Sequence, residues 1–240
     1  MNEYSTNDLK LLKEKYQDNY EKVLEKLNNG YPIQYLIGNV NFYGYQINVD
    51  ERALIPRFET EGLVEKTIKL IKESRINPNI IDICTGTGCI AIALSKELNI
   101  NVDALDISKD AITLAKENAK LNNAFVNFIN EDIKNFKTNK KYNILISNPP
   151  YVKEDEDIDP KTKYEPQIAL FAKENGLEFY KIILEKSKNI LEEKNIIAFE
   201  IGAKENEDIK ALAKKYYPKS KIICEKDLAG LNRYIFIINE

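Results

Sequence analysis

The chain has 240 residues, of which 43% are hydrophobic and 30% charged, and its 35 Lys and Arg against 38 Asp and Glu give a net charge of −3. This composition predicts a globular protein, and the length suits one large domain with a small extension. The absence of histidine excludes imidazole as general base, metal ligand or member of a Ser-His-Asp triad. The negative charge disfavours an enzyme that grips long stretches of nucleic-acid duplex, although it leaves room for a local basic patch.

The three cysteines, Cys84, Cys89 and Cys224, include no C-x-x-C pair. This disfavours a disulfide framework and a zinc site, and we expect no metal and a reducing cytoplasm. The amino terminus has neither a basic start nor an apolar run, and no apolar stretch is long enough to span a bilayer. We therefore expect a soluble, cytoplasmic protein without a membrane partner.

Three segments of different character follow one another along the chain. Residues 1–38 predict a short helical segment, because apolar residues recur at helical spacing up to Gly30. Residues 39–55 contain two short strand-like runs around Gly44 and predict a connecting β-hairpin. Residues 56–240 alternate apolar strands with amphipathic helices, which predicts a mostly parallel sheet with helices on both faces.

The third segment predicts seven strands and five main helices. The strands are expected at Ile80–Cys84, Val102–Asp106, Val126–Asn130, Tyr142–Ser147, Ile196–Ile201, Lys221–Cys224 and Tyr234–Ile238. The helices are expected near Glu61–Glu73, Cys89–Leu98, Lys109–Leu121, Leu177–Leu191 and Glu205–Tyr216. Too few residues separate the last two strands for a crossover helix, so the last strand should be antiparallel. The acid-rich run from Lys153 to Lys163 predicts a surface loop.

A glycine turn follows the first strand of the sheet. The strand ends in Asp82-Ile83-Cys84-Thr85-Gly86-Thr87-Gly88 and leads directly into a helix. Glycines let the backbone approach a ligand closely, and the free N–H groups of a helix start can bind it. A glycine pair alone is equally typical of an ordinary strand-to-helix turn. The run from Gly86 to Ala91 also fits G-x-G-x-x-A, which keeps a dehydrogenase among the alternatives.

Asp106 ends the second strand, twenty residues after Gly86. A carboxylate at this place can accept hydrogen bonds from both hydroxyls of a ribose, whereas an isolated Asp at a strand end more often caps a helix. Together the turn and Asp106 favour a cofactor that contains adenosine.

The fourth strand runs into Asn148-Pro149-Pro150-Tyr151. In an open α/β sheet, ligands bind at the carboxyl ends of the strands, which puts Asn148 beside the cofactor. The prolines restrict the backbone, so that the Asn148 side chain and the Pro149 carbonyl can accept from the two N–H groups of one planar amino group. An aromatic ring such as Tyr151 can cover its face. The alternative is a Pro-Pro turn that only closes the strand.

With these motifs the chain resembles the S-adenosylmethionine-dependent methyltransferases that modify planar amino groups, and among them the peptide chain release factor N5-glutamine methyltransferases. The resemblance covers nearly the whole chain. It includes Pro32–Gly38, Phe42-Tyr43-Gly44, Leu54-Ile55-Pro56-Arg57-Phe58-Glu59-Thr60-Glu61 and Phe199-Glu200-Ile201-Gly202. It implies a Rossmann-like class I methyltransferase fold with a seven-stranded sheet.

The resemblance also implies a reaction and a set of site residues. The reaction is methyl transfer from S-adenosyl-L-methionine to the glutamine amide of the Gly-Gly-Gln motif in class 1 peptide chain release factors. The cofactor would bind Cys84, Thr85, Gly86, Thr87 and Gly88 by its methionine part and Asp106 by its ribose, and Asp132 and Ile133 would lie beside its adenine. Asp82 would also belong to the cofactor-binding residues. Asn148, Pro149, Pro150 and Tyr151 would hold the target glutamine, with Asn148 also touching the cofactor.

The chain departs from the family pattern at three places. Cys84 replaces the first glycine of the turn, Phe58 replaces the second proline of P-R-P-E-T-E, and the helical part before Gly30 is shorter than usual. The way in which a release factor docks therefore cannot simply be transferred. For Arg57, Glu59 and Glu61, a charged helix start and a role at the mouth of the site are equally open.

Other functions stay open as alternatives. A methyltransferase acting on an exocyclic amino group of a nucleic-acid base would use the same Asn-Pro-Pro-Tyr chemistry, but the net charge and the lack of room for a target-reading domain disfavour stable nucleic-acid binding. A non-catalytic binding protein would not need both Asp106 and Asn148. A dehydrogenase would leave Asn-Pro-Pro-Tyr unexplained.

Overall fold

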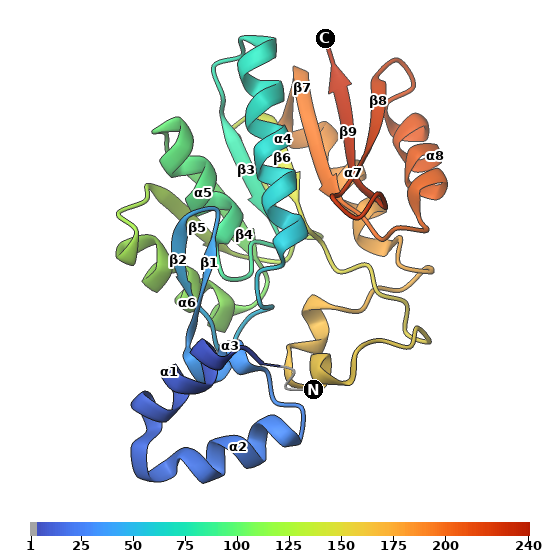
Figure 1. Cartoon of the computed structure of the whole chain (residues 1–240). Coiled ribbons are helices and arrows are strands. Elements are labelled where there is room, and N and C mark those ends of the chain that lie inside the picture. Colours follow the sequence, from blue (N-terminus) through green and yellow to red (C-terminus); the bar gives the residue numbers. More distant parts are fainter. Residues whose placement is uncertain (1–3) are drawn as a thin grey trace.

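A seven-stranded sheet forms the centre of the computed structural model, which describes residues 4–240 (Figure 1). The strand order is β5-β4-β3-β6-β7-β9-β8. Neighbouring strands are parallel except where β9 pairs with β7 and β8, so the prediction of a mostly parallel sheet with an antiparallel last strand is confirmed. The strands are β3 (Ile80–Ile83), β4 (Val102–Asp106), β5 (Val126–Asn130), β6 (Tyr142–Ser147), β7 (Leu191–Glu200), β8 (Lys221–Lys226) and β9 (Asn232–Asn239).

Helices cover both faces of this sheet, as expected for strands that are apolar on both sides. Successive residues of a strand face opposite layers, so Ile80 and Ile144 belong to one core and Ile81 and Leu145 to the other. The first core includes side chains of α4 (Phe58–Ser74), α5 (Cys89–Leu98) and α6 (Lys109–Leu121). The second includes side chains of α7 (Glu178–Ile190) and α8 (Asn206–Tyr216).

Several predicted boundaries shift by a few residues. Strand β3 stops before Cys84, because Cys84 has a φ of 62° and thus a left-handed backbone. Helix α7 ends earlier than predicted and β7 begins earlier, because Leu191 already pairs with Tyr142. Helix α4 begins at Phe58, before the predicted start. Strands β4, β5 and β6 and helices α5 and α6 have the predicted bounds.

The amino-terminal part consists of short helices and a hairpin. Helices α1 (Thr6–Tyr16), α2 (Tyr20–Asn28) and α3 (Ile33–Ile37) are accompanied by a 3-10 turn, η1 (Gln17–Asn19), and share a small core of their own. Strands β1 (Asn39–Phe42) and β2 (Tyr45–Asn48) pair antiparallel around Tyr43 and Gly44, whose φ angles are both positive. Such angles are typical of a two-residue hairpin turn. The proposed domain limits at residues 38 and 55 stay predictions.

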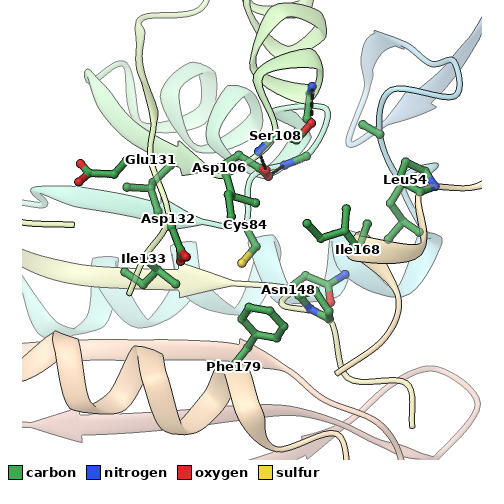
Figure 2. Close-up of a pocket in the computed structure, with 18 of the residues that line it drawn as sticks. Leu54, Cys84, Asp106, Ser108, Glu131, Asp132, Ile133, Asn148, Ile168 and Phe179 are labelled. Carbon is green, nitrogen blue, oxygen red and sulfur yellow. Dashed lines mark hydrogen bonds between the residues drawn. The ribbon is translucent and has the colours of Figure 1, made fainter. Parts of the chain in front are cut away.

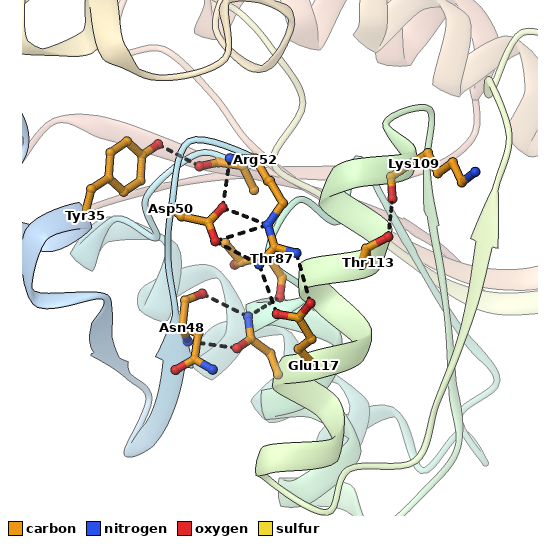
Figure 3. Close-up of polar contacts among 10 residues, drawn as sticks. Tyr35, Asn48, Asp50, Arg52, Thr87, Lys109, Thr113 and Glu117 are labelled. Atoms are coloured by element: carbon orange, nitrogen blue, oxygen red, sulfur yellow. Dashed lines mark hydrogen bonds and ion pairs between the residues drawn. The ribbon is translucent and has the colours of Figure 1, made fainter.

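Polar contacts fasten the hairpin to the sheet domain (Figure 3). The Asn118 amide of α6 accepts from Asn48 N–H at 2.8 Å and donates to the Asn48 and Thr87 carbonyls at 3.1 and 3.0 Å. The Arg52 guanidinium donates to the Asp50 and Glu117 carboxylates. Those bonds hold the pKa of both carboxyls below their usual range. One buried amide therefore connects the hairpin with the glycine turn.

The predicted surface loop from Lys153 to Lys163 is exposed at its acidic residues, but its last part forms a 3-10 turn, η2 (Pro160–Tyr164). A second 3-10 turn, η3 (Gln167–Ala169), follows. Tyr164 donates its hydroxyl to the Asn29 carbonyl at 3.0 Å, which ties this region to α2. Within residues 4–240, no helix has the length and apolarity needed to cross a membrane.

Candidate active site

The carboxyl ends of β3, β4 and β6 meet at one edge of the sheet, where the strand order reverses around β3. Ligands of open α/β sheets bind at such a point. A cavity of about 230 Å³ opens there, and Figure 2 shows residues that line it. Its polar walls come from Gly86, Asp106, Ser108, Glu131, Asp132 and Asn148, and its apolar walls from Leu54, Ala111, Ile133, Pro150, Ile168 and Phe179. We call it the cofactor cavity.

Asp106 and the glycine turn form one wall of the cofactor cavity. Gly86 and Ser108 donate their N–H groups to Oδ2 and Oδ1 of Asp106, each at 2.9 Å. Burial raises the pKa of Asp106, and these two N–H groups oppose the rise. A Cβ placed on Gly86 would meet no atom within 4 Å, whereas one on Gly88 would lie 3.0 Å from the Cβ of Ala115. Gly86 thus leaves space on the open side of the turn, and Gly88 permits close packing of α6.

Asp82 lies under the turn and is fully buried. Its Oδ2 accepts from the Thr85 hydroxyl at 2.5 Å, and its Oδ1 has no hydrogen-bond partner within the described part of the chain. Burial raises the pKa of Asp82 to about 7. The structure places Asp82, Thr85, Thr87 and Gly88 outside the lining of the cofactor cavity, so they shape the turn, and their contact with a cofactor stays a prediction.

Cys84 occupies the position where the glycine of the family pattern stands. Its φ of 62° is one that glycine adopts without strain. The side chain lines the cofactor cavity, and the sulfur is directed toward the space between Asp132 and Asn148 (Figure 2). Burial raises the pKa of the Cys84 thiol well above its usual range. The position therefore accepts a side chain, and the thiol stays protonated.

Asp132 and Ile133 follow β5 and line the cofactor cavity, and their contact with an adenine stays a prediction. The apolar residues of the lining that were not predicted include Leu54, Ile168 and Phe179. Leu54 stands in one of the motifs that carry the family resemblance, and that motif was the signal by which its place in the site could have been predicted. Ile168 and Phe179 lie in η3 and α7, and nothing in their local sequence marks them, because only the return of the chain across the sheet edge brings them to the cavity.

Asn148 stands where the cofactor cavity meets a second one. Asn148, Leu54 and Ala169 line both cavities. Pro150 faces the cofactor cavity, whereas Pro149 and Tyr151 face the second. The remaining walls of this acceptor cavity are formed by Arg57, Val152, Ile158, Thr162, Leu170 and Glu200. The Asn-Pro-Pro-Tyr segment thus separates two adjoining spaces, each of which it helps to line.

An ion pair between distant segments holds the wall of the acceptor cavity. The buried Glu165 carboxylate accepts from Ile55 N–H at 3.0 Å and from the Arg57 guanidinium at 2.6 Å. These residues are more than a hundred positions apart in the sequence. The contact fixes the segment before α4 against the segment after η2, and Glu165 carried no sign of this in the sequence.

The charged start of α4 has mixed roles. Arg57 lines the acceptor cavity, which agrees with a place at its mouth. Glu61 accepts from Tyr43 N–H at 3.0 Å, and the Glu59 carbonyl accepts from the Tyr234 hydroxyl at 2.7 Å. These two contacts join α4 to the hairpin turn and to β9. Phe58 begins the helix with 66% of its surface exposed.

The chemistry of the cofactor cavity fits a nucleoside-containing ligand. Each Asp106 oxygen accepts one backbone N–H and keeps lone-pair capacity for a further donor such as a ribose hydroxyl. Leu54, Ile133, Ile168 and Phe179 supply apolar surface of the kind that covers a planar ring. Among residues 4–240, no cluster of Asp, Glu or Cys has the arrangement of a metal site.

Comparison with known proteins agrees with this arrangement. The family model described as Methyltransferase small domain matches residues 63–164. The release factor glutamine methyltransferase of Enterococcus faecalis is 40% identical over 215 residues, which cover 88% of this chain and 76% of the relative. That of Bacillus anthracis is 36% identical over 230 residues, covering 92% and 81%.

Solved structures show the same fold at lower identity. A methyltransferase from Pyrococcus furiosus is similar with a TM-score of 0.59 and 15% identity, over 93% of this chain and 99% of that one. The Rossmann-like class I methyltransferase fold predicted from the sequence is thereby confirmed.

Proposed function

Since the chain belongs to the family of release factor glutamine methyltransferases, we propose that it methylates the glutamine of the Gly-Gly-Gln motif in class 1 peptide chain release factors. Its cofactor is S-adenosyl-L-methionine. The acceptor atom is the side-chain amide nitrogen. The single observation that carries the proposal is the place of Asn148, which lines both the cofactor cavity and the acceptor cavity.

The cofactor would lie between the glycine turn and α7. Asp106 would accept from the ribose hydroxyls, and Asp132 and Ile133 would contact the adenine, because all three line the cavity. Cys84 and Gly86 would border the methionine part. When bound, the cofactor supplies a methyl group that is already activated by its sulfonium.

The protein residues would act mainly by position. An amide nitrogen is a weak nucleophile, since its lone pair is delocalised into the carbonyl. Asn148 Oδ1 and the Pro149 carbonyl would accept from the two N–H groups, orient the nitrogen and stabilise positive charge as it attacks. Tyr151 and Leu54 would exclude water, which strengthens both hydrogen bonds. The product nitrogen is strongly acidic, so its proton can leave without a dedicated base.

A protein substrate fits the surroundings of the acceptor cavity better than a nucleic acid does. The loop that contributes Ile158 and Thr162 to its wall also exposes Glu154, Asp155 and Glu156. Carboxylates at the mouth of a site repel phosphates. A release factor that works in translation also implies a cytoplasmic place, and we propose neither a membrane partner nor stable nucleic-acid binding.

The test is to incubate the enzyme with methyl-labelled S-adenosyl-L-methionine and, separately, with release factor, tRNA and DNA. We expect label only in the release factor, with mass spectrometry placing the methyl on the Gly-Gly-Gln glutamine. Label on nucleic acid, or on another residue, would overturn the substrate. S-adenosyl-L-methionine should also stabilise the fold by about 2.7 kcal/mol at a hundredfold excess over Kd, and stabilisation by NAD instead would contradict the cofactor.

A further inference from the structure

A chain of polar side chains connects Asn148 to the interior of the protein. The Thr60 hydroxyl, in the first turn of α4, donates to Oε2 of Glu200 at 2.7 Å. Asn148 Nδ2 donates to Oγ1 of Thr60 at 3.3 Å. Thr60 and Glu200 are 3% and 1% exposed. Three segments that are far apart in the sequence therefore meet at the side chain that separates the two cavities.

The hydrogen bonds that join Asn148, Thr60 and Glu200 can run in one direction only while Glu200 is ionised. An ionised carboxylate can only accept hydrogen bonds, and a threonine hydroxyl has one proton to donate. Because Thr60 gives that proton to Glu200, it can only accept from Asn148, which must therefore turn its –NH2 group toward Thr60. Within residues 4–240, Oδ1 of Asn148 accepts no hydrogen bond, and it is left available to a donor in the cavities.

We propose that Thr60 and Glu200 are positioning residues that hold the Asn148 amide in the orientation in which Oδ1 faces the methyl acceptor. The inference rests on the proposed function, because it assigns a task to Oδ1. An asparagine amide is nearly symmetric in shape, so packing alone hardly distinguishes its two orientations. With the amide turned over, Asn148 would present two donors to a substrate amide that itself donates, and the contact would be lost.

The ionisation of Glu200 controls the direction of the hydrogen bonds. A protonated Glu200 could donate to Thr60, which would free the Thr60 proton for Asn148 and favour the reversed amide. Burial, with a smaller contribution from the charge of Glu59, raises the pKa of Glu200 to about 7, against the bonds from Thr60 and Tyr151 and the charge of Arg233, which lower it. The groups packed around Glu200 also include Tyr180, which donates to its carbonyl at 2.8 Å, and Tyr234, which faces it from β9. Methyl transfer should therefore decline below about pH 7 as Glu200 gains a proton.

The first experiment removes the Thr60 hydroxyl, which lies between Asn148 and Glu200. Thr60→Val keeps the shape of the side chain, and we expect kcat to fall roughly tenfold to a hundredfold with an unchanged Kd for S-adenosyl-L-methionine. Thr60→Ser should restore most of the rate. The matched control is Thr67→Val, because Thr67 is buried in the same helix but donates to the Leu63 carbonyl, away from the site. An equal kcat in Thr60→Val and Thr67→Val would overturn the inference.

The second experiment tests the direction of the hydrogen bonds. Asn148→Asp places a second carboxylate on the Thr60 hydroxyl, which can serve only one of them. Adding Glu200→Gln provides an –NH2 donor for Thr60 and frees its proton for the new carboxylate. The double variant should therefore be roughly tenfold more active than Asn148→Asp alone, although Glu200→Gln lowers kcat in the wild-type background and removes the acid limb of its pH profile. A purely structural role predicts the same loss in both backgrounds, and that result would overturn the inference.

The wild-type enzyme and Asn148→Ala together separate this inference from the proposed function. If the wild-type enzyme transfers no methyl group to a release factor, the proposed function is wrong. If Asn148→Ala retains full methyl transfer, the function stands, but Oδ1 of Asn148 has no task in it and the positioning inference is wrong. If Asn148→Ala is inactive while Thr60→Val behaves as Thr67→Val does, only the positioning inference is wrong. Thermal unfolding and S-adenosyl-L-methionine binding of each variant identify any loss of fold, and Thr60→Ser and Glu200→Gln are conservative enough to keep the test decisive.

Discussion

The two cavities that meet at Asn148 are built in different ways. The cofactor cavity takes its polar groups from the ends of adjacent strands, so Asp106 accepts from Gly86 and Ser108 through short backbone contacts. The acceptor cavity depends on side-chain contacts across more than a hundred residues, above all Glu165 with Arg57 and Ile55. Sheet topology positions the first, whereas buried polar bonds between separate segments position the second.

This difference indicates which amino-acid substitutions each cavity tolerates. A substitution on the cofactor side removes one contact while the strands keep their register. A substitution on the acceptor side can release a whole segment, because a buried carboxylate left without its partner is costly. Binding of cofactor and transfer of the methyl group should therefore be separable by mutation.

The largest expected effect is on transfer at the shared residue. Asn148→Ala should lower kcat by roughly two to three orders of magnitude, as expected for loss of one preorganised polar contact to a transition state, and should leave S-adenosyl-L-methionine affinity nearly unchanged. Asn143→Ala is the matched control, because Asn143 bonds Asn79 and Asn77 at the other end of β6. The measurement is single-turnover methylation of a release factor alongside cofactor titration. Equal losses of affinity and rate would show that the two cavities do not act separately.

The next effect concerns the cofactor side alone. Asp106→Ala should weaken S-adenosyl-L-methionine binding by about 1–3 kcal/mol, since it removes a charged acceptor, while kcat at saturating cofactor changes little. Calorimetric titration measures the change. Asp110→Ala, in the exposed first turn of α6, removes the same charge from outside the cavity and should bind normally. An affinity unchanged by Asp106→Ala would leave Asp106 with its backbone contacts only.

A third prediction concerns how stability depends on pH. A buried carboxyl lies near each cavity, Asp82 under the glycine turn and Glu200 in the wall of the acceptor cavity, and burial raises the pKa of each to about 7. Between the ordinary carboxyl pKa and about 7, the folded state binds more protons than the unfolded state. The free energy of unfolding should therefore fall as pH rises through this range. Asp82→Asn and Glu200→Gln should each reduce that fall by on the order of 1–2 kcal/mol, measured by urea unfolding at pH 5 and pH 8. A pH dependence identical to that of the wild type in both variants would contradict the burial of charge on either side.

The smallest effect is expected at Cys84. Cys84→Gly removes the strain of a left-handed backbone at a residue with a side chain, which costs roughly 1–2 kcal/mol. The same substitution loses the packing of the thiol and increases the conformational freedom of the unfolded chain. Its stability should therefore stay within about 1 kcal/mol of the wild type, with activity within about threefold. Cys84→Ala keeps the strain without the thiol and should be the less stable of the two. Reducing agents should not alter the rate, and inactivation by Cys84→Gly would reveal a role of the thiol in the site.

The sequence by itself determined the sheet, the glycine turn, Asp106 and the Asn-Pro-Pro-Tyr segment. These features depend on periodicity and on short-range backbone geometry, both of which are visible in neighbouring residues. The motifs that carry the family resemblance also include Leu54, Thr60 and Glu200. Nothing in the sequence indicated that Thr60 and Glu200 would meet at Asn148.

Only the tertiary structure decided which distant side chains meet. Ile168 and Phe179 reach the cofactor cavity because the chain returns across the sheet edge after β6. Glu165 meets Arg57, and Thr60 links Asn148 to Glu200, because an unpaired buried donor or acceptor is costly and most of them bond to whatever partner the fold brings near. The physical reason is that hydrogen bonding and burial depend on distance in space, which a pattern of neighbouring residues does not contain.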